Sequence, residues 1–159
     1  MHKSKKLARY SWESLNRQQV GAFSEYFVKM ELTMLGFQVY STEVDDRGID
    51  FVTRYEQGPF VAIQVKSVRE KGYVFMQKEK FQLSRNLYLA LAILKEGVEP
   101  FLYLIPSLAW KNPNALLVDR DYIGKKSKPE WGINISYKNL KLLNEYLFAK
   151  TVIQLQNLA

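Results

Sequence analysis

The segment from Asn16 to Val68 constrains the fold most, because it predicts one long helix followed by three short extended runs. Asn16 is suited to cap the start of a helix, and Gly36 is suited to end it, so we expect this helix over about 16–35. Gly58-Pro59 then indicates a hairpin between two of the runs. The three apolar runs of strand length lie at 37–44, 49–55 and 60–68.

The rest of the chain predicts a second helix, over about 78–96, with leucines at helical spacing and Gly97 after it. Further strands are expected at 101–105, 116–119 and 132–135, with a last helix from about Ser136. The order helix, three strands, helix, strand predicts an α/β fold with a mixed sheet. No linker-like stretch interrupts the sequence, so we expect a single domain over 1–159, with a core at about 16–106 and additions at about 107–159.

Several classes of site are excluded by composition. The chain has no cysteine, which excludes disulfide scaffolds, thiolate metal sites and cysteine nucleophiles. Its single histidine, His2, argues against serine–histidine triads and histidine metal cages. We find no Gly-rich phosphate loop or dinucleotide fingerprint, and therefore expect no organic cofactor. The longest apolar run, 87–94, is too short to span a bilayer, so we expect a soluble, cytoplasmic protein without a membrane partner.

The charge pattern indicates a polyanionic partner. The net charge is +7 and the pI is near 9.5. Acidic residues gather instead between 43 and 56, and an acidic pocket in a basic protein is typical of a metal-dependent nuclease. Clustered basic residues are the candidates for nucleic-acid contacts: Lys3, Lys5, Lys6, Arg9, Arg69, Lys71, Lys125, Lys126 and Lys128.

Glu25 is a candidate functional acid within the first helix. Helical geometry places Phe23, Phe27, Met30 and Met34 in one apolar stripe, which we expect to face the core. Glu25 lies roughly opposite, among Gly21, Val28, Leu32 and Leu35. A helix that is apolar on both sides is buried on both, and a buried carboxylate needs a cation or a lysine as its partner. A solvent-exposed glutamate is the alternative.

The run at 60–66 carries polar residues on one side. By strand alternation, Gln64 and Lys66 share one face, whereas an edge strand with a solvated face is the alternative. Asp50 begins the preceding run. Together with Glu25, these residues supply two carboxylates, an amide oxygen and an amine, which suits a Mg²⁺ or Mn²⁺ site with a lysine to orient water.

The pairing of the two hairpin strands tests this grouping. A four-residue loop between Tyr55 and Phe60 would put Asp50 opposite Val65, away from Lys66. We therefore expect an odd loop or a bulge near Gly58-Pro59. It would place Asp50 opposite Lys66 and Val52 opposite Gln64.

In four segments the chain resembles the PD-(D/E)xK phosphodiesterase superfamily, which includes restriction endonucleases and archaeal-type Holliday junction resolvases. The segments are Gly21-Ala-Phe-Ser-Glu25, Gly36-Phe37, Gly48-Ile-Asp50 and Gln64-Val-Lys66-Ser67. The likeness is strongest to uncharacterised bacterial branches with a Gln-x-Lys third motif, and it covers residues 16–70 well. It implies a restriction-endonuclease-like αβββαβ core with a mixed central sheet flanked by helices.

The resemblance also implies roles for individual residues. Asp50 would be the central metal ligand, Glu25 the helical acid and Lys66 the catalytic lysine. Gln64 takes the place of the usual second acid and would add an oxygen ligand. Asp46 and Ser67 are secondary candidates, respectively for the metal and for phosphate.

The expected activity is that of a Mg²⁺-dependent DNA endonuclease, with Mn²⁺ as a substitute, RNA left open as substrate, and a homodimer favoured by the resemblance. Two alternatives remain. One is a nucleic-acid-binding module with weak or no catalysis, which glutamine in the third motif would fit. The other is a docking subunit of a DNA defence or mobile-element system. Trp110 and Trp131 would stack on bases or lie in the core.

Overall fold

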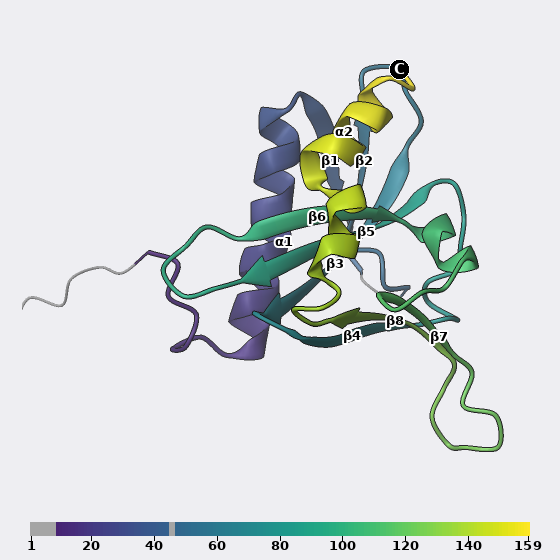
Figure 1. Ribbon diagram of the computed structural model, residues 1–159. Coiled ribbons are helices and arrows are strands. Elements are labelled where there is room, and N and C mark those ends of the chain that lie inside the picture. The colour runs from purple at the N-terminus through teal and green to yellow at the C-terminus, as the bar shows by residue number, and fades with distance from the viewer. Residues whose placement is uncertain (1–8, 45–46) are drawn as a thin grey trace, which may run out of the picture.

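The computed structural model describes residues 9–44 and 47–159, and in these ranges two sheets pack together beside two α-helices (Figure 1). The helices are α1 (Arg17–Met34) and α2 (Phe148–Gln156), with short 3-10 helices η1 (Ser107–Lys111) and η2 (Leu140–Tyr146). The strands are β1 (Phe37–Ser41), β2 (Phe51–Tyr55), β3 (Val61–Arg69), β4 (Gly72–Gln77), β5 (Leu87–Leu94), β6 (Phe101–Pro106), β7 (Leu117–Arg120) and β8 (Glu130–Ile135).

Helix α1 begins and ends as the sequence predicts. The Asn16 side chain accepts from the Gln19 backbone N–H, and the Gln19 side chain accepts from the Asn16 N–H, which forms a capping box. At the other end, Gly36 has a φ of 88°, a conformation that a side chain would disfavour.

The predicted core stripe of α1 is partly wrong. Met30 and Met34 are 51% and 78% exposed, whereas Val28 and Leu32, from the side that carries Glu25, are fully buried. Phe27 is buried as predicted. Both sides of the helix are apolar in sequence, so the position of the sheet decides which one is covered.

The central sheet has the strand order β1-β2-β3-β5-β6, with β3 and β5 parallel and the other neighbours antiparallel. Residues 56–60, an odd number, form the hairpin between β2 and β3, as expected. The predicted register is displaced by two residues, however, because Val52 pairs with Ala62 and not with Gln64. The physical reason is a tighter turn: Glu56 adopts a positive φ and the Gly58 N–H bonds to the Tyr55 carbonyl, so the chain reverses within fewer residues than a five-residue loop would need.

The predicted helix over 78–96 is wrong, because residues 87–94 form β5. This strand lies between β3 and β6, and almost all of it is buried. A strand covered on both faces has an unbroken apolar sequence, in which helical spacing also occurs. The chain between β3 and β5 instead forms β4, which joins β8 and β7 in a separate three-stranded sheet. The expected last helix divides into η2 and α2.

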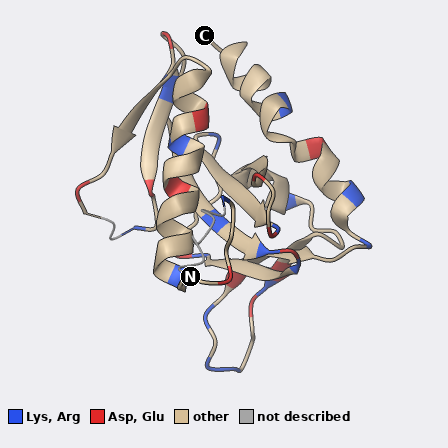
Figure 2. Cartoon of the chain, turned by 90° about the vertical axis from the view of Figure 1, so that its left-hand side faces the viewer, with Lys and Arg blue, Asp and Glu red and all other residues tan. Residues whose placement is uncertain are grey.

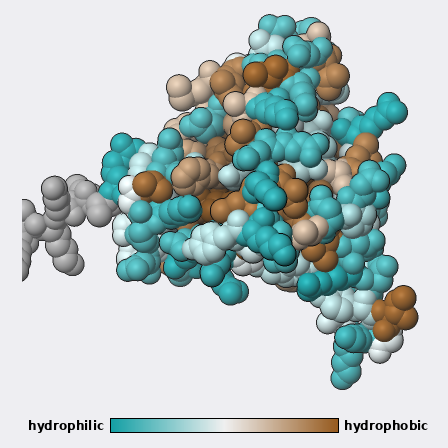
Figure 3. Space-filling view, viewed as in Figure 1, coloured by the Kyte–Doolittle hydropathy of each residue, from teal (hydrophilic) through white to brown (hydrophobic). Residues whose placement is uncertain are grey.

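Different layers cover the two faces of the central sheet. Helices α1 and α2 pack on the face that includes Ile63, Ala90 and Leu104. The small sheet and the two 3-10 helices pack on the other face, where the Trp110 indole N–H donates to the Gly132 carbonyl. Trp110 is therefore a core residue, and half-buried Trp131 packs against the same core beneath Lys78. Figure 3 shows hydrophilic residues over much of the surface, with apolar ones exposed between them.

None of the helices in the described ranges combines the length and apolar character that a membrane crossing requires.

The capping box predicts a measurable contribution to stability. Asn16→Ala removes the acceptor for the Gln19 N–H, so we expect unfolding in urea to lose about 1 kcal/mol. Gln18→Ala, at an exposed position of the same turn, is the matched control. Equal stability of the two variants would contradict the importance of this cap.

Candidate functional site

The second half of β3 has an edge that β2 leaves unpaired. Among the described residues, β2 pairs with β3 over Val61–Ile63, whereas β5 pairs with it over Ala62–Arg69. Strand alternation turns the backbone N–H groups of residues 65, 67 and 69 toward this edge, since the Glu70 N–H bonds to β5. The candidate site is built around this edge.

Asp50 lies immediately before β2 and contacts β3 beside Gln64. Its backbone N–H donates to the Ile63 carbonyl at 2.9 Å, and its Oδ2 accepts from the Val65 N–H at 2.6 Å. These two bonds place the carboxylate next to Gln64 rather than opposite Lys66, the partner that the sequence predicted. The Val65 N–H also orients the carboxylate.

Gln64 carries a buried oxygen that lacks a partner. The residue is 9% exposed, and its Oε1 finds no hydrogen-bond partner among the described residues. Gly48 packs against the amide nitrogen, because a Cβ at that position would lie 3.5 Å from Gln64 Nε2. A buried amide oxygen without a partner costs free energy, so it is a candidate ligand for a cation.

Lys66 lines a basic groove of about 920 Å³ between the start of α1, the open edge of β3 and strand β4. Ser67 and Arg69 line it too, together with Arg17 and Lys71. No acidic residue belongs to its described lining. Figure 2 shows basic positions at the start of α1 and on the strands beside it. The groove therefore has the charge to hold a polyanion.

Glu25 pairs with a lysine, one of the two partners that the sequence predicted for it. The Lys29 ammonium lies 2.9 Å from Glu25 Oε1, and the Glu25 side chain is 32% exposed. Lys29 also donates to Ser41 Oγ and lies over the Phe51 ring. Ser41 pairs with Phe51, so the Glu25–Lys29 pair sits at the end of β2 where Asp50 lies. It is on the face of the sheet that α1 covers, however, whereas Gln64 and Lys66 belong to the opposite face.

The other predicted contact residues are dispersed. Arg69 donates to the Leu15 carbonyl at the groove, whereas Lys128 pairs with Glu79 and Arg9 stacks on Tyr10. Lys125 and Lys126 are exposed in the connection between β7 and β8. The remaining predicted residues lie outside the described residues: Lys3, Lys5, Lys6 and Asp46.

Sequence reasoning missed the residues that β4 brings to the groove. Tyr73 and Phe75 line its wall, and the Tyr73 hydroxyl donates to Glu130. The pKa of Tyr73 is raised above its ordinary value of 10.0. Burial is the largest cause and this hydrogen bond is the second. The available signal was the run Tyr73-Val-Phe-Met76, which is rich in strand-forming residues and follows Gly72.

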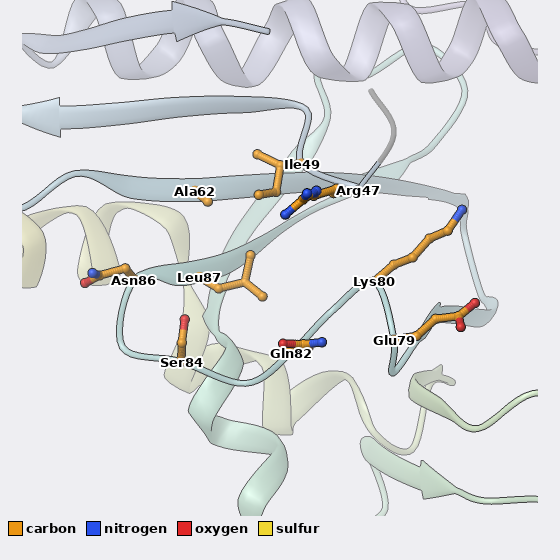
Figure 4. Close-up of a pocket in the computed structure, with 9 residues that line it drawn as sticks. All are labelled: Arg47, Ile49, Ala62, Glu79, Lys80, Gln82, Ser84, Asn86 and Leu87. Carbon is orange, nitrogen blue, oxygen red and sulfur yellow. The ribbon is translucent and has the colours of Figure 1, made fainter. Parts of the chain in front are cut away.

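A second cavity, of about 590 Å³, lies near Gly48 (Figure 4). Arg47 and Ile49 lie on one side of it, and the segment 79–87 lies on the other. Lys80 lines this cavity and also approaches Gly48. The sequence had not pointed to it, because it forms where the predicted second helix is replaced by a loop.

The donors present fit a hard cation with few protein ligands. Asp50, just before β2, comes opposite Gln64 of β3, whose Oε1 finds no partner among the described residues, so the two side chains are neighbouring sources of oxygen ligands. Mg²⁺ commonly keeps several waters and takes one or two carboxylates from the protein. In the described part of the chain, no three His, Asp or Glu side chains gather as a metal cluster, so Gln64 is central to any such site.

The chain has a restriction-endonuclease-like fold, with a central mixed sheet flanked by helices. It is similar to the solved structure of Hjc from Archaeoglobus fulgidus, a Holliday junction resolvase from an archaeal hyperthermophile. The TM-score is 0.54 and the identity 14%, over 85% of this chain and 96% of that one. No protein-family model and no curated protein matches the sequence. The likeness confirms the fold class that the sequence predicted.

The raised pKa of Tyr73 predicts a dependence of stability on alkaline pH. The folded protein holds this proton more tightly than the unfolded chain, so the stabilisation is complete below about pH 10 and is lost as the pH rises further. Tyr73→Phe should therefore lose less stability than wild type when urea unfolding is compared from about pH 9 to about pH 11. Parallel curves for the two proteins would contradict the shift.

Proposed function

We propose that the chain is a metal-dependent endonuclease that hydrolyses phosphodiester bonds of DNA. One observation carries the proposal: Gln64, whose buried oxygen has no partner among the described residues, lies opposite Asp50 and its oriented carboxylate, at a strand edge that borders a basic groove. The fold shared with a resolvase supports this reading, as does the resemblance of the motifs around Glu25 and Lys66 to PD-(D/E)xK enzymes of the Gln-x-Lys type.

In this proposal Asp50 and Gln64 hold Mg²⁺, or Mn²⁺ in its place, through oxygen atoms. Glu25 acts through water rather than as a direct ligand, because its ion pair with Lys29 lies at the same end of β2 but on the other face of the sheet from Gln64. A cation held there would supply Lewis-acid polarisation of a phosphoryl oxygen and would lower the pKa of a water molecule.

The remaining steps belong to the side chains of the groove. Lys66 orients the attacking water and offsets negative charge that develops on the phosphate. The Val65 N–H keeps the Asp50 carboxylate in place while this happens. Arg69 and Lys71 hold the flanking phosphates, and Ser67 donates a hydrogen bond to one of them. Binding through these cations weakens as salt is added.

A binding module without catalysis is the second candidate. It is favoured by the neutral amide at position 64, which is a weaker ligand than a carboxylate, and by the pairing of Glu25 with Lys29. Salt-sensitive DNA binding without cleavage would support it. A docking subunit of a defence or mobile-element system would show neither DNA binding nor DNA cleavage.

The expected homodimer stays a prediction, which sedimentation of the purified chain would test.

Lys66→Met should abolish cleavage without unfolding the protein. The substitution removes the ammonium group but keeps most of the apolar stem. We expect nicking of supercoiled plasmid with Mg²⁺ or Mn²⁺, none with EDTA, and a loss of about 100-fold or more in the variant. Lys150→Met, on the exposed side of α2, is the matched control. Absence of nicking by wild type on supercoiled, linear and branched DNA would remove the catalytic proposal.

Gln64→Glu should strengthen metal binding. The change adds a negative charge beside the proposed cation at nearly constant volume, and hard cations favour anionic oxygen. Calorimetry should show tighter Mn²⁺ binding than in wild type, and activity should survive or rise at low metal concentration. Gln82→Glu adds the same charge at an exposed position and serves as the control. Equal, negligible binding in all three proteins would mean that Gln64 holds no metal and that the new carboxylate pairs with Lys66.

A further inference from the structure

Strand β4 presents aromatic side chains on its outer face, away from the core. Val74 and Met76 point into the core between the sheets, so Tyr73 and Phe75 occupy the opposite face. Their ring centroids are 6.3 Å apart and the planes differ by 18°. Phe75 is 47% exposed, although it is a large apolar residue in a strand. Both residues line the groove that holds Lys66.

The Tyr73 ring is held by contacts with β8, whereas the neighbouring Phe75 ring stays exposed to solvent. The ring lies across Gly132 of β8, where any Cβ would collide with it, and its hydroxyl is bonded to Glu130. Phe75 itself pairs with Gly132, which has no side chain of its own to cover the Phe75 ring. Exposed aromatics in strands usually pack on a cross-strand partner, and Phe75 has none at the paired position.

Cations accompany the aromatic rings along this wall. The Arg120 guanidinium lies 4.4 Å from the centroid of Tyr73. Lys71, which lines the groove, lies 4.9 Å from the centroid of Tyr137, a residue that is 66% exposed. Basic groups that track a phosphate backbone, combined with rings on which bases stack, are the features that bind single-stranded nucleic acid.

We propose that the groove binds a single-stranded segment of DNA, with its phosphates along Arg69 and Lys71 and an unpaired base stacked on Phe75. The proposal rests on the proposed function, because it takes the groove as the DNA-binding surface. The bases of an intact duplex are stacked on one another, so they offer no free face to a side wall. The substrate class is therefore DNA with an unpaired segment, such as a flap, a gap or an overhang.

Binding can be tested apart from cleavage. Fluorescence anisotropy in EDTA would compare a labelled single strand, the same strand as a blunt duplex, and a duplex with a single-stranded overhang. Wild type should bind the single strand and the overhang more tightly than the blunt duplex. Phe75→Ala should weaken binding to the two unpaired substrates about tenfold and leave duplex binding unchanged. Phe75→Trp keeps a ring on which a base can stack, so it should retain the affinity for the two unpaired substrates.

Phe60→Ala provides the matched control. Phe60 is 49% exposed and has Arg54 over its ring, but it lies outside the groove lining. Equal affinity for paired and unpaired DNA, or the same effect from Phe60→Ala as from Phe75→Ala, would overturn the stacking proposal and leave the endonuclease proposal standing. No binding of any DNA by wild type would overturn both. Stacking-dependent binding without nicking under Mg²⁺ would support this proposal and reject the endonuclease.

Discussion

The parallel pairing of β3 with β5 is the constraint on which the rest of the structure depends. It runs from Ala62–Leu87 to Arg69–Leu94 and places β5 in the interior of the central sheet, between β3 and β6. Both faces of β5 must then be covered, and α1 with α2 covers one while the small sheet covers the other. A parallel pair also requires a long connection, and β4 is part of the one used here.

The site follows from the unequal lengths of the two ladders on β3. Because β5 pairs with β3 from Ala62 to its end and β2 pairs only with the first part of β3, the second part of β3 keeps one edge for other contacts. Asp50 caps this edge at the Val65 N–H, while Gln64 and Lys66 point toward the small sheet. The basic groove lies along this unpaired edge of β3, toward the start of α1. The candidate metal ligands and the basic groove therefore lie at the same place, the part of β3 that β2 leaves unpaired.

The local elements were predictable where a single residue imposes them. Asn16 and Gly36 bound α1 because a cap and a positive φ are local requirements. Gly58-Pro59 marks the hairpin because the turn is also local: the Gly58 N–H bonds to the Tyr55 carbonyl, which a Cβ at this position would crowd. The strand β5 was mistaken for a helix because its burial on both faces removes the alternation that identifies a strand. The Met30 and Met34 stripe was misplaced because nothing within a helix tells which apolar side meets the sheet.

For the candidate site, the sequence by itself determined the chemical inventory: two carboxylates, an amide and a lysine, with Gln64 and Lys66 on one face of their strand because strand alternation is local. Tertiary structure decided the rest. The register of β2 set Asp50 against Val65, the packing of α1 on the sheet brought Lys29 to Ser41 and to the Phe51 ring, and the folding of β4 onto β8 brought aromatic rings to the groove. Each of these depends on residues far apart in the chain, whose distances are fixed by packing rather than by local conformational preference.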